Sequence, residues 1–394
     1  MGLDVFTHDP ASKRFWPAAG AGAAGARRLA ALLRLGVALA AWLAPVCRAA
    51  AGPAAPDATF QPVTPGASPE AVALLRFMYG ISGRHTLTGQ HNYPNTGDAS
   101  TRKAALVCGK APSVFGQDFG FSAPGDIDAI AARPRNVGLV KRQYEGGAII
   151  ALCWHAVRPI DDEPVSFDNS VQGKLSDKEW TELTTPGTGL HKRWCAQVDV
   201  VAAYLKQLQA AHVPVLWRPY HEMNGDWFWW GGRPGAGGST AIYRQLFDRL
   251  VNHHKINNLI WIWNVDRPVE HRGSFKAYFP GADFFDIASL DVYDSDFSQS
   301  YYDDLLRLAA GKPIGLAEVG PAPAPAVLER QPKWAWWMIW AEMIPEKGTP
   351  EAGALKAVVD DPRSWSLGDQ AYIEATAPIR AASGLQALPA GRAD

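Results

Sequence analysis

Short runs of apolar residues recur along most of the chain and alternate with segments of helical periodicity. Several runs are apolar throughout, as in strands that are buried on both faces. The predicted strands are Thr86–Gln90, Ser113–Gln117, Ala148–Trp154, Pro214–Tyr220, Leu259–Asn264, Asp286–Val292, Pro313–Ala317 and Ala335–Trp340. Between them, Gln197–Ala211 and Thr240–His254 are predicted helices. Eight strands that alternate with helices predict an α/β fold, a (β/α)8 TIM barrel with a single catalytic domain.

Polar residues stand at or just after the end of each of the first seven apolar runs. In a TIM barrel the active site lies at the carboxyl ends of the strands. We therefore expect functional side chains among these residues, and packing alone does not explain why they all fall at one end. They are Gln90, His91, Asp118, His155, His221, Glu222, Asn264, Asp266, Tyr293 and Glu318.

The N-terminal segment is typical of a signal peptide. Arg27, Arg28 and Arg34 precede the apolar run Leu35–Val46, and alanines follow at the expected cleavage zone. That run is too short for a membrane span of about 20 residues. We therefore expect residues 1–51 to be a targeting segment, 52–66 a linker rich in Pro and Ala, and 67–385 the catalytic domain of a secreted or periplasmic protein.

Charge is nearly balanced, with 38 basic and 39 acidic side chains and a formal net charge of −1. This composition argues against a nucleic-acid partner and favours a neutral substrate. The 16 tryptophans suit carbohydrate binding, because an indole offers a broad apolar face and one N–H donor to a sugar ring. We expect a monomer without a stable membrane span.

Cys108, Cys153 and Cys195 remain once the targeting segment with Cys47 is set aside. Three thiols allow at most one disulfide, and their spacing fits no metal site. Buried unpaired thiols and one disulfide are both compatible with the sequence. No metal or other cofactor is implied.

The most informative segment is WRPYHEMNGDWFWWGG, residues 217–232. A strand runs directly into Glu222, and aromatic residues follow. An aromatic surrounding lowers the local dielectric constant and raises the pKa of a carboxyl group, as a general acid requires. The alternative interpretation is a buried salt bridge between Glu222 and Arg218.

A second acid stands at the end of the seventh predicted strand, in KPIGLAEVGP, residues 312–321. Strands four and seven of a closed barrel face one cavity, so Glu318 and Glu222 are expected to meet there. Retaining glycosidases use two carboxyl groups about 5–5.5 Å apart, one as nucleophile and one as acid/base.

These segments resemble glycoside hydrolase family 26, most of whose members are β-mannanases. The resemblance is supported by GQHN at residues 89–92, CWHAVRP at 153–159 and DVYD at 291–294. It implies a retaining endo-β-1,4-mannanase that acts on a neutral β-linked polysaccharide without a cofactor. It also implies that Glu222 is the acid/base and Glu318 the nucleophile.

The resemblance assigns further roles around these two acids. It implies that His155 and His221 contact the sugar at the cleavage point and that Trp227 packs near the same subsite. Tyr293 would hydrogen-bond the nucleophile, and Trp340 would be a sugar platform. Trp336 and Trp337 remain alternatives for the platform. Many family members have Arg after that last tryptophan, but this chain has Ala341.

Three other functions remain open. Some relatives of the family hydrolyse mixed-linkage β-glucan or β-1,3-xylan. A carbohydrate-binding barrel without activity is disfavoured by the presence of both glutamates. A structural cell-surface protein is suggested only by the N-terminal apolar run.

Overall fold

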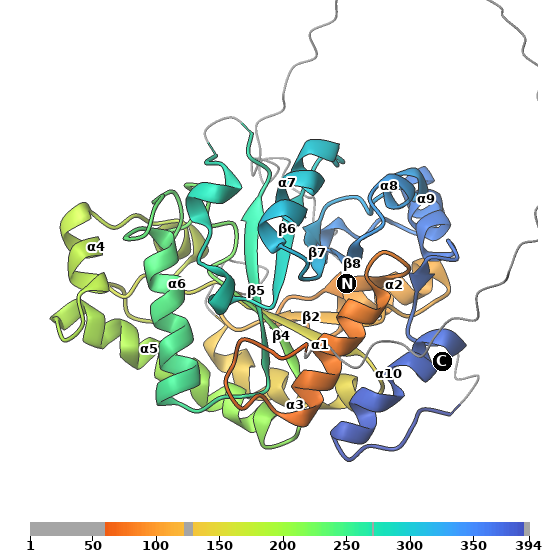
Figure 1. Cartoon of the computed structure of the whole chain (residues 1–394), viewed down its shortest axis with the longest axis horizontal. Coiled ribbons are helices and arrows are strands. Elements are labelled where there is room, and N and C mark those ends of the chain that lie inside the picture. The colour runs from red at the N-terminus through yellow and green to blue at the C-terminus, as the bar shows by residue number, and fades with distance from the viewer. Residues whose placement is uncertain (1–59, 122–128, 270–271, 390–394) are drawn as a thin grey trace, which may run out of the picture. The chain divides into compact units, whose positions relative to one another are not determined.

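Eight parallel strands close into a barrel in the computed structural model of the chain, which describes residues 60–121, 129–269 and 272–389 (Figure 1). Neighbours pair in the order β2-β3-β4-β5-β6-β7-β8-β1, and β1 also pairs with β2. The strands are β1 (Thr86–His91), β2 (Val114–Asp118), β3 (Ile149–Trp154), β4 (Val215–Pro219), β5 (Leu259–Asp266), β6 (Ile287–Val292), β7 (Ile314–Val319) and β8 (Trp334–Ile339). Each overlaps a predicted strand, and the TIM barrel prediction is confirmed.

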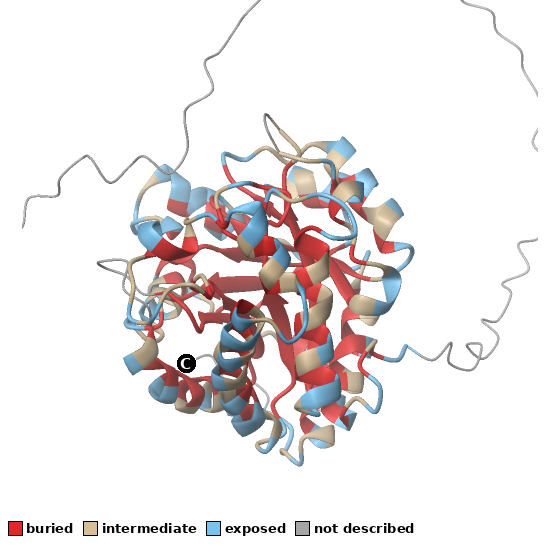
Figure 2. Ribbon diagram, turned by 90° about the vertical axis from the view of Figure 1, so that its left-hand side faces the viewer, coloured by how far each residue is buried: buried red, intermediate tan, exposed pale blue. Residues whose placement is uncertain are grey.

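Helices connect the strands and surround the barrel. They are α1 (Pro69–Ile81), α2 (Ala99–Cys108), α3 (Arg133–Glu145), α4 (Asp177–Thr184), α5 (Gly189–Gln209), α6 (Ser239–Asp248), α7 (Gln299–Ala309), α8 (Pro325–Arg330), α9 (Pro350–Val359) and α10 (Gln370–Ala382). A short strand, β9 (Ser364–Trp365), pairs with the start of β1 outside the barrel. Buried residues concentrate in the strands and on the inner faces of the helices (Figure 2).

The helix ends follow from local sequence signals. Thr188 caps α5, because its side chain accepts a hydrogen bond from the backbone of His191. Ser176 and Glu179 form a capping box at the start of α4. The buried side of α5 includes Leu205 at helical spacing from its other apolar residues. Full burial of one such leucine contributes about 1.5–3 kcal/mol.

The chain contacts the barrel before the predicted domain boundary at residue 67. The backbone N–H of Val63 donates a 2.7 Å hydrogen bond to Asp286, which immediately precedes β6. Phe60 stacks on Tyr79, and Thr64 is buried. Residues 60–66, assigned to the linker from the sequence, therefore lie against the domain. Residues 1–59, with the predicted targeting segment, lie outside the described part of the chain.

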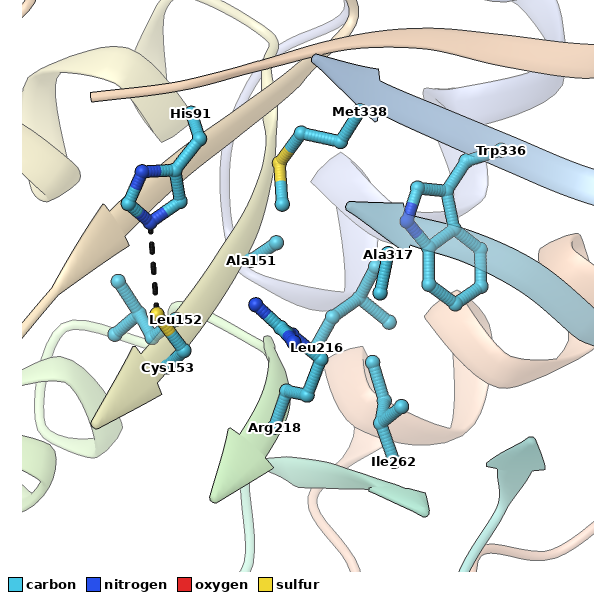
Figure 3. A pocket seen from close by; sticks show the side chains of 10 residues that line it. All are labelled: His91, Ala151, Leu152, Cys153, Leu216, Arg218, Ile262, Ala317, Trp336 and Met338. Carbon is cyan, nitrogen blue, oxygen red and sulfur yellow. Dashed lines mark hydrogen bonds between the residues drawn. The ribbon is translucent and has the colours of Figure 1, made fainter. Parts of the chain in front are cut away.

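The barrel interior is filled by side chains. A cavity of about 10 Å³ lies between β1, β3, β4 and β8 and is lined by Arg218, Cys153, Trp336 and Met338, among others (Figure 3). It has room for about one water molecule and none for a sugar ring. The barrel interior therefore offers no binding site for a molecule of that size, and the polar side chains at the carboxyl ends of the strands are the place to examine.

Of the two alternatives that the sequence left open for Cys108, Cys153 and Cys195, the structure shows unpaired thiols. Cys108 and Cys153 are buried. Over the ranges that the structure describes, no helix combines the length and hydrophobicity that a bilayer crossing requires.

Candidate active site

Two glutamates at the carboxyl ends of β4 and β7 face the same space at the barrel mouth. Glu222 follows β4, and Glu318 is the penultimate residue of β7. One carboxylate oxygen from each of these residues and one from Asp291 all lie within 4.8 Å of one another. Glu222 and Glu318 are each 4% exposed. The sequence expectation that positions 222 and 318 meet in one pocket is therefore met.

The backbone turns sharply where β4 ends. Tyr220 and Glu222 have φ angles of 46° and 49°, in the left-handed region that side chains disfavour. Such conformations cost about 1–3 kcal/mol each and cluster at active sites. Two hydrogen bonds hold the turn: Glu222 N–H donates to Asn264 Oδ1 at 2.7 Å, and the Trp230 indole donates to His221 O at 2.7 Å. The turn directs the Glu222 side chain toward Glu318.

Arg218, inside β4, binds the nucleophile candidate and not the acid candidate. Its Nη1 donates a 2.9 Å hydrogen bond to Asp291 Oδ2, and its Nη2 is hydrogen bonded to Glu318 Oε1. Both carboxylates and the guanidinium are buried. The alternative interpretation, a salt bridge between Arg218 and Glu222, is therefore wrong.

Tyr293 and Asn264 complete this buried network. The Tyr293 hydroxyl donates a 2.8 Å hydrogen bond to Glu318 Oε2. Asn264 Nδ2 donates to Asp291 Oδ1 and to Ser289 Oγ, both at 2.8 Å. Glu318 is thus held by a donor at each carboxylate oxygen, which fixes its orientation. Tyr293 stands where the sequence resemblance expects the residue that aligns the nucleophile.

The surroundings of Glu222 favour its protonated form. Burial raises the pKa of Glu222 well above its ordinary value, and the negative charges of Asp266, Asp291 and Glu318 raise it further. The indole N–H of Trp227 donates a 2.6 Å hydrogen bond to Glu222 Oε2 and lowers the pKa in part. A carboxyl group that keeps its proton near neutral pH can act as a general acid.

His155 and His221 lie beside the acids and contact each other, with Nε2 atoms 3.0 Å apart. Asp118 fixes their arrangement, because its carboxylate accepts from the Nδ1–H and the backbone N–H of His155. Burial lowers the pKa of His221 well below its ordinary value, and the charge of Arg218 adds to this effect. His221 is therefore neutral, and its Nε2 is hydrogen bonded to His155 Nε2. His221 Nε2 is also 3.9 Å from Glu318 Oε1.

Aromatic rings form the wall around the two histidines. Phe228 and Trp230 stack with ring centroids 4.4 Å apart. Phe228 also meets His155 and His221 edge to face, at 5.3 and 5.1 Å. Phe228 and Trp230 thus supply an apolar wall beside the two histidines. Trp227 stands apart from this role, because its N–H reaches Glu222.

Trp340 lies at the pocket and the alternative tryptophans do not. Its ring stacks on His91 with centroids 4.1 Å apart and contacts His155 at 5.8 Å. Trp336 lines the cavity within the barrel, and Trp337 packs on the outer side under α2 and α9. Of the three tryptophans, Trp340 is therefore the one that lies beside the histidines next to the two acids.

The position after Trp340, where the sequence resemblance leads us to expect an arginine, is occupied by Ala341. Ala341 is buried, and the polar group here is the carboxylate of Glu342, which accepts a hydrogen bond from the Tyr93 hydroxyl. Tyr93 meets Trp340 edge to face at 5.9 Å. The rim therefore presents an acidic hydrogen-bond acceptor.

Two side chains that the sequence prediction did not place at the site, Arg218 and Asp291, belong to it, together with Asn264 and Asp118 from the predicted strand ends. Each was visible as a polar residue inside or at the end of an apolar strand, and Arg218 and Asp291 stand inside the quoted motifs. A buried charge in a strand requires a partner. The sequence carries this signal, but the identity of each partner depends on the register between neighbouring strands.

Donor spacing alone suggests three groups in the described residues that could hold a metal ion: His91, Asp118 and Cys153; Asp199, His253 and His254; and Glu222, Asp291 and Glu318. In the second group, both oxygens of Asp199 already accept from Arg249, at 2.7 and 2.6 Å. In the third, Arg218 binds Asp291 and Glu318. These contacts compete with a cation.

Residues 63–369 match the sequence pattern of glycosyl hydrolase family 26. The chain belongs to this family. It is 32% identical over 286 residues to a mannan endo-1,4-beta-mannosidase of Thermothelomyces thermophilus, a match that covers 71% of this chain and 56% of that protein. The chain thus spans little more than half the length of this curated relative.

Two solved structures of family 26 members resemble this one. GH26A from Muricauda sp. MAR_2010_75 is 43% identical, with a TM-score of 0.73 over 77% of this chain and 98% of that chain. The GH26-CBM35 beta-(1,4)-mannanase of Podospora anserina is 26% identical, with a TM-score of 0.66 over 82% of this chain and 71% of that chain.

Proposed function

We propose that this family 26 chain is a retaining endo-β-1,4-mannanase that hydrolyses mannan-type polysaccharides by double displacement. The observation that carries the proposal is the approach of the Glu222 and Glu318 carboxylates, within 4.8 Å through their oxygens. This approach suits the spacing of about 5–5.5 Å in retaining enzymes better than the roughly 6.5–9.5 Å of inverting ones. The relatives from Thermothelomyces and Podospora support mannan as the substrate.

In the first step, a carboxylate oxygen of Glu318 attacks the anomeric carbon, and the bond from that carbon to the leaving oxygen breaks. Glu222 transfers its proton to the leaving oxygen. Arg218 and Tyr293 hold Glu318 in line for the attack. The product of this step is a glycosyl ester of Glu318 together with the released end of the chain.

In the second step, Glu222 acts as a base. Formation of the ester removes the negative charge of Glu318, one of the charges that raise the pKa of Glu222. The pKa of Glu222 therefore falls when a base is required. Glu222 accepts a proton from water, the water oxygen bonds to the anomeric carbon, and the ester bond to Glu318 breaks. The two inversions give net retention.

Substrate and stereochemistry are tested together. The purified chain is incubated with mannan, galactomannan, lichenan and β-1,3-xylan, and released reducing ends and product sizes are measured. The proposal expects fastest release from mannan, internal cleavage, and the β-anomer as the first product by NMR. Faster release from lichenan or from β-1,3-xylan would show that the enzyme is instead a β-glucanase or a β-1,3-xylanase with the same catalytic acids. The α-anomer as first product would exclude a retaining mechanism.

The roles of the two acids are tested by Glu318→Ala and Glu222→Ala. Loss of Glu318 should abolish turnover of every substrate. Loss of Glu222 should sharply lower kcat/KM on mannan but spare kcat/KM on aryl β-mannosides with activated leaving groups, because their first step needs no proton. On these substrates kcat should still fall, because hydrolysis of the ester loses its base. Binding of mannan without turnover by the unchanged protein would favour a carbohydrate-binding barrel.

We further propose that residues 1–51 direct the protein out of the cytoplasm and that it acts as a monomer. The basic residues before Leu35–Val46 and the alanines after it support this localisation. Cell fractionation and N-terminal sequencing of the mature protein test it. A cytoplasmic protein with an intact N-terminus would contradict it, and the mass in solution tests the oligomeric state.

A further inference from the structure

Trp227 is held from two sides while its N–H is hydrogen bonded to Glu222. A Cβ added at Gly225 would overlap Cη2, Cζ3 and Cζ2 of the indole at nearly equal separations, so the glycine backbone lies against the face of the six-membered ring. The guanidinium carbon of Arg272 lies over the Trp227 ring, 4.9 Å from its centroid. This is the geometry of a cation–π contact.

Arg272 is itself held by a buried acid. Its Nε lies 2.6 Å from Asp266 Oδ2, and the Asp266 side chain at the end of β5 is fully buried. The Arg272 side chain is only 9% exposed. A guanidinium in such surroundings keeps one position, since it loses a charged partner if it swings away. The position of the indole therefore depends on a residue in the loop after β5.

Asn224 fixes the two loops relative to each other. Its Nδ2 donates to the backbone oxygens of Asp266 and Gly273, at 2.7 and 3.2 Å, and its Oδ1 accepts from the backbone N–H of Asp266 at 2.7 Å. Gly273 N–H also donates to Asn224 O at 3.0 Å. The loop that carries Trp227 and the loop that carries Arg272 thus form one unit.

We propose that Arg272 is a positioning residue for the acid/base: anchored on Asp266, it fixes the Trp227 indole so that its N–H stays on Glu222 Oε2. The inference rests on the proposed function, because it assigns Arg272 to the proton-transfer half of that mechanism. Arg272 acts through Trp227 and leaves the nucleophile Glu318 unaffected.

The role predicts a selective kinetic defect. Arg272→Met should lower kcat/KM on mannan by about 10–100-fold, since misplacement of a catalytic group by about 1 Å costs a factor of this size. On an aryl β-mannoside with a dinitrophenol leaving group, which departs without a proton, kcat/KM should fall by less than about threefold. General acid catalysis contributes about 10²–10⁴-fold where the leaving group needs a proton, and this substrate does not depend on that contribution. Arg272→Lys keeps the charge but not the planar stack, and should recover only part of the loss.

The pH profile gives a second readout. The groups that face Glu222 are Asp266, Asp291 and Glu318 from three strands, and the Trp227 N–H. Removal of the positive charge of Arg272 and weakening of the hydrogen bond from the Trp227 N–H to Glu222 both favour the protonated form of Glu222. The basic limb of kcat/KM on mannan should therefore move to higher pH in Arg272→Met.

Arg267→Met is the matched control. Arg267 also lies beside Asp266, with Nε 3.7 Å from Oδ1, and is similarly buried, but its other partners are Asp294 and Asp296. Loss of the Arg267 side chain should change kcat/KM on mannan and on the aryl β-mannoside by equal factors. In Arg272→Met the buried Asp266 loses its nearest cation, and the double variant Arg272→Met, Asp266→Asn removes that charge, so it should regain thermal stability while its mannan defect persists.

The outcomes separate the two proposals. If Arg272→Met lowers kcat/KM equally on both substrates and leaves the basic limb of the pH profile in place, Arg272 is only structural and the inference is overturned. The same holds if the double variant recovers activity on mannan. If Glu222→Ala itself fails to distinguish mannan from the aryl mannoside, the proposed acid/base role fails first.

Discussion

The guanidinium of Arg218 is hydrogen bonded to the carboxylate of Glu318, which lies 100 positions further along the chain. Its other terminal nitrogen binds Asp291, whose Cα is the register partner of Glu318 across β6 and β7 at a β-bulge. One cation is thus shared between two neighbouring buried acids. Without it, like charges would meet in a site from which water is largely excluded.

Arg218→Met should therefore weaken both fold and activity. Removal of one partner from a buried ion pair costs about 3–5 kcal/mol of unfolding free energy. We expect kcat/KM on mannan to fall by at least about 100-fold, because Glu318 loses a charged hydrogen bond that orients it. Denaturant unfolding and kinetics measure the two effects. Arg307→Met, which breaks an exposed pair with Asp304, should cost less than about 1 kcal/mol; equal losses in both variants would refute the role of burial.

Tyr293→Phe removes one hydroxyl and keeps the ring. The lost hydrogen bond to Glu318 Oε2 is charge-assisted and worth about 1.5–3 kcal/mol, so kcat should fall by about 10–100-fold. The loss should appear with mannan and with aryl mannosides alike, since the nucleophile serves both. A defect confined to mannan would instead connect Tyr293 with the acid/base.

Glu222→Gln should stabilise the protein in a pH-dependent way. Burial and neighbouring carboxylates raise the pKa of Glu222 in the folded state. Glu222 therefore does not lower the free energy of unfolding below the unfolded pKa of about 4.3, and lowers it increasingly as pH rises toward the folded pKa. The gain in unfolding free energy from Gln should be near zero at about pH 4 and increase by up to about 1.4 kcal/mol per pH unit above it. Thermal unfolding at pH 4, 6 and 8 measures it, and a gain that is independent of pH would contradict this electrostatic origin.

Asp118→Asn has the opposite dependence. Burial alone would raise the pKa of Asp118, but the contact with His155 lowers it to about 2. This acid therefore adds stability above the unfolded pKa of about 3.9, and the contribution disappears as pH falls toward 2. Asp118→Asn should lower the Tm at pH 7 and have little effect near pH 2. It should also reduce kcat/KM by about tenfold or more, because His155 loses the partner that fixes its Nδ1 proton; full activity at pH 7 would exclude that role.

The barrel could be predicted from the sequence because its strands are short apolar runs buried on both faces. Each predicted strand lies within two residues of the observed one at either end, as for Thr86–Gln90 and β1. The pairing of Glu222 with Glu318 followed from the closure of the barrel. The start of the domain was less accessible: Val63 and Phe60 lie in a Pro- and Ala-rich stretch, and the segment packs through contacts with Asp286, just before β6, and with Tyr79 that no local pattern indicates.

The partners within the site could not be predicted in the same way. The choice of Asp291 and Glu318 over Glu222 as partners of Arg218 depends on the β-bulge at Ala317 in β7 and on the left-handed turn at Glu222. No glycine or proline stands at the bulge itself, and Pro219 before the turn does not indicate which carboxylates Arg218 binds. Arg272 was not singled out, because its role depends on a contact across two loops.

The hydrogen bonds that set the spacing of Glu222 and Glu318 run through Asn264, Asp291 and Arg218, all of which stand on barrel strands. Loops can therefore lengthen, shorten or change composition during evolution without moving the two acids apart. A lineage built on this scaffold is free to alter which polysaccharide lies in the cleft while it inherits the bond-breaking geometry intact.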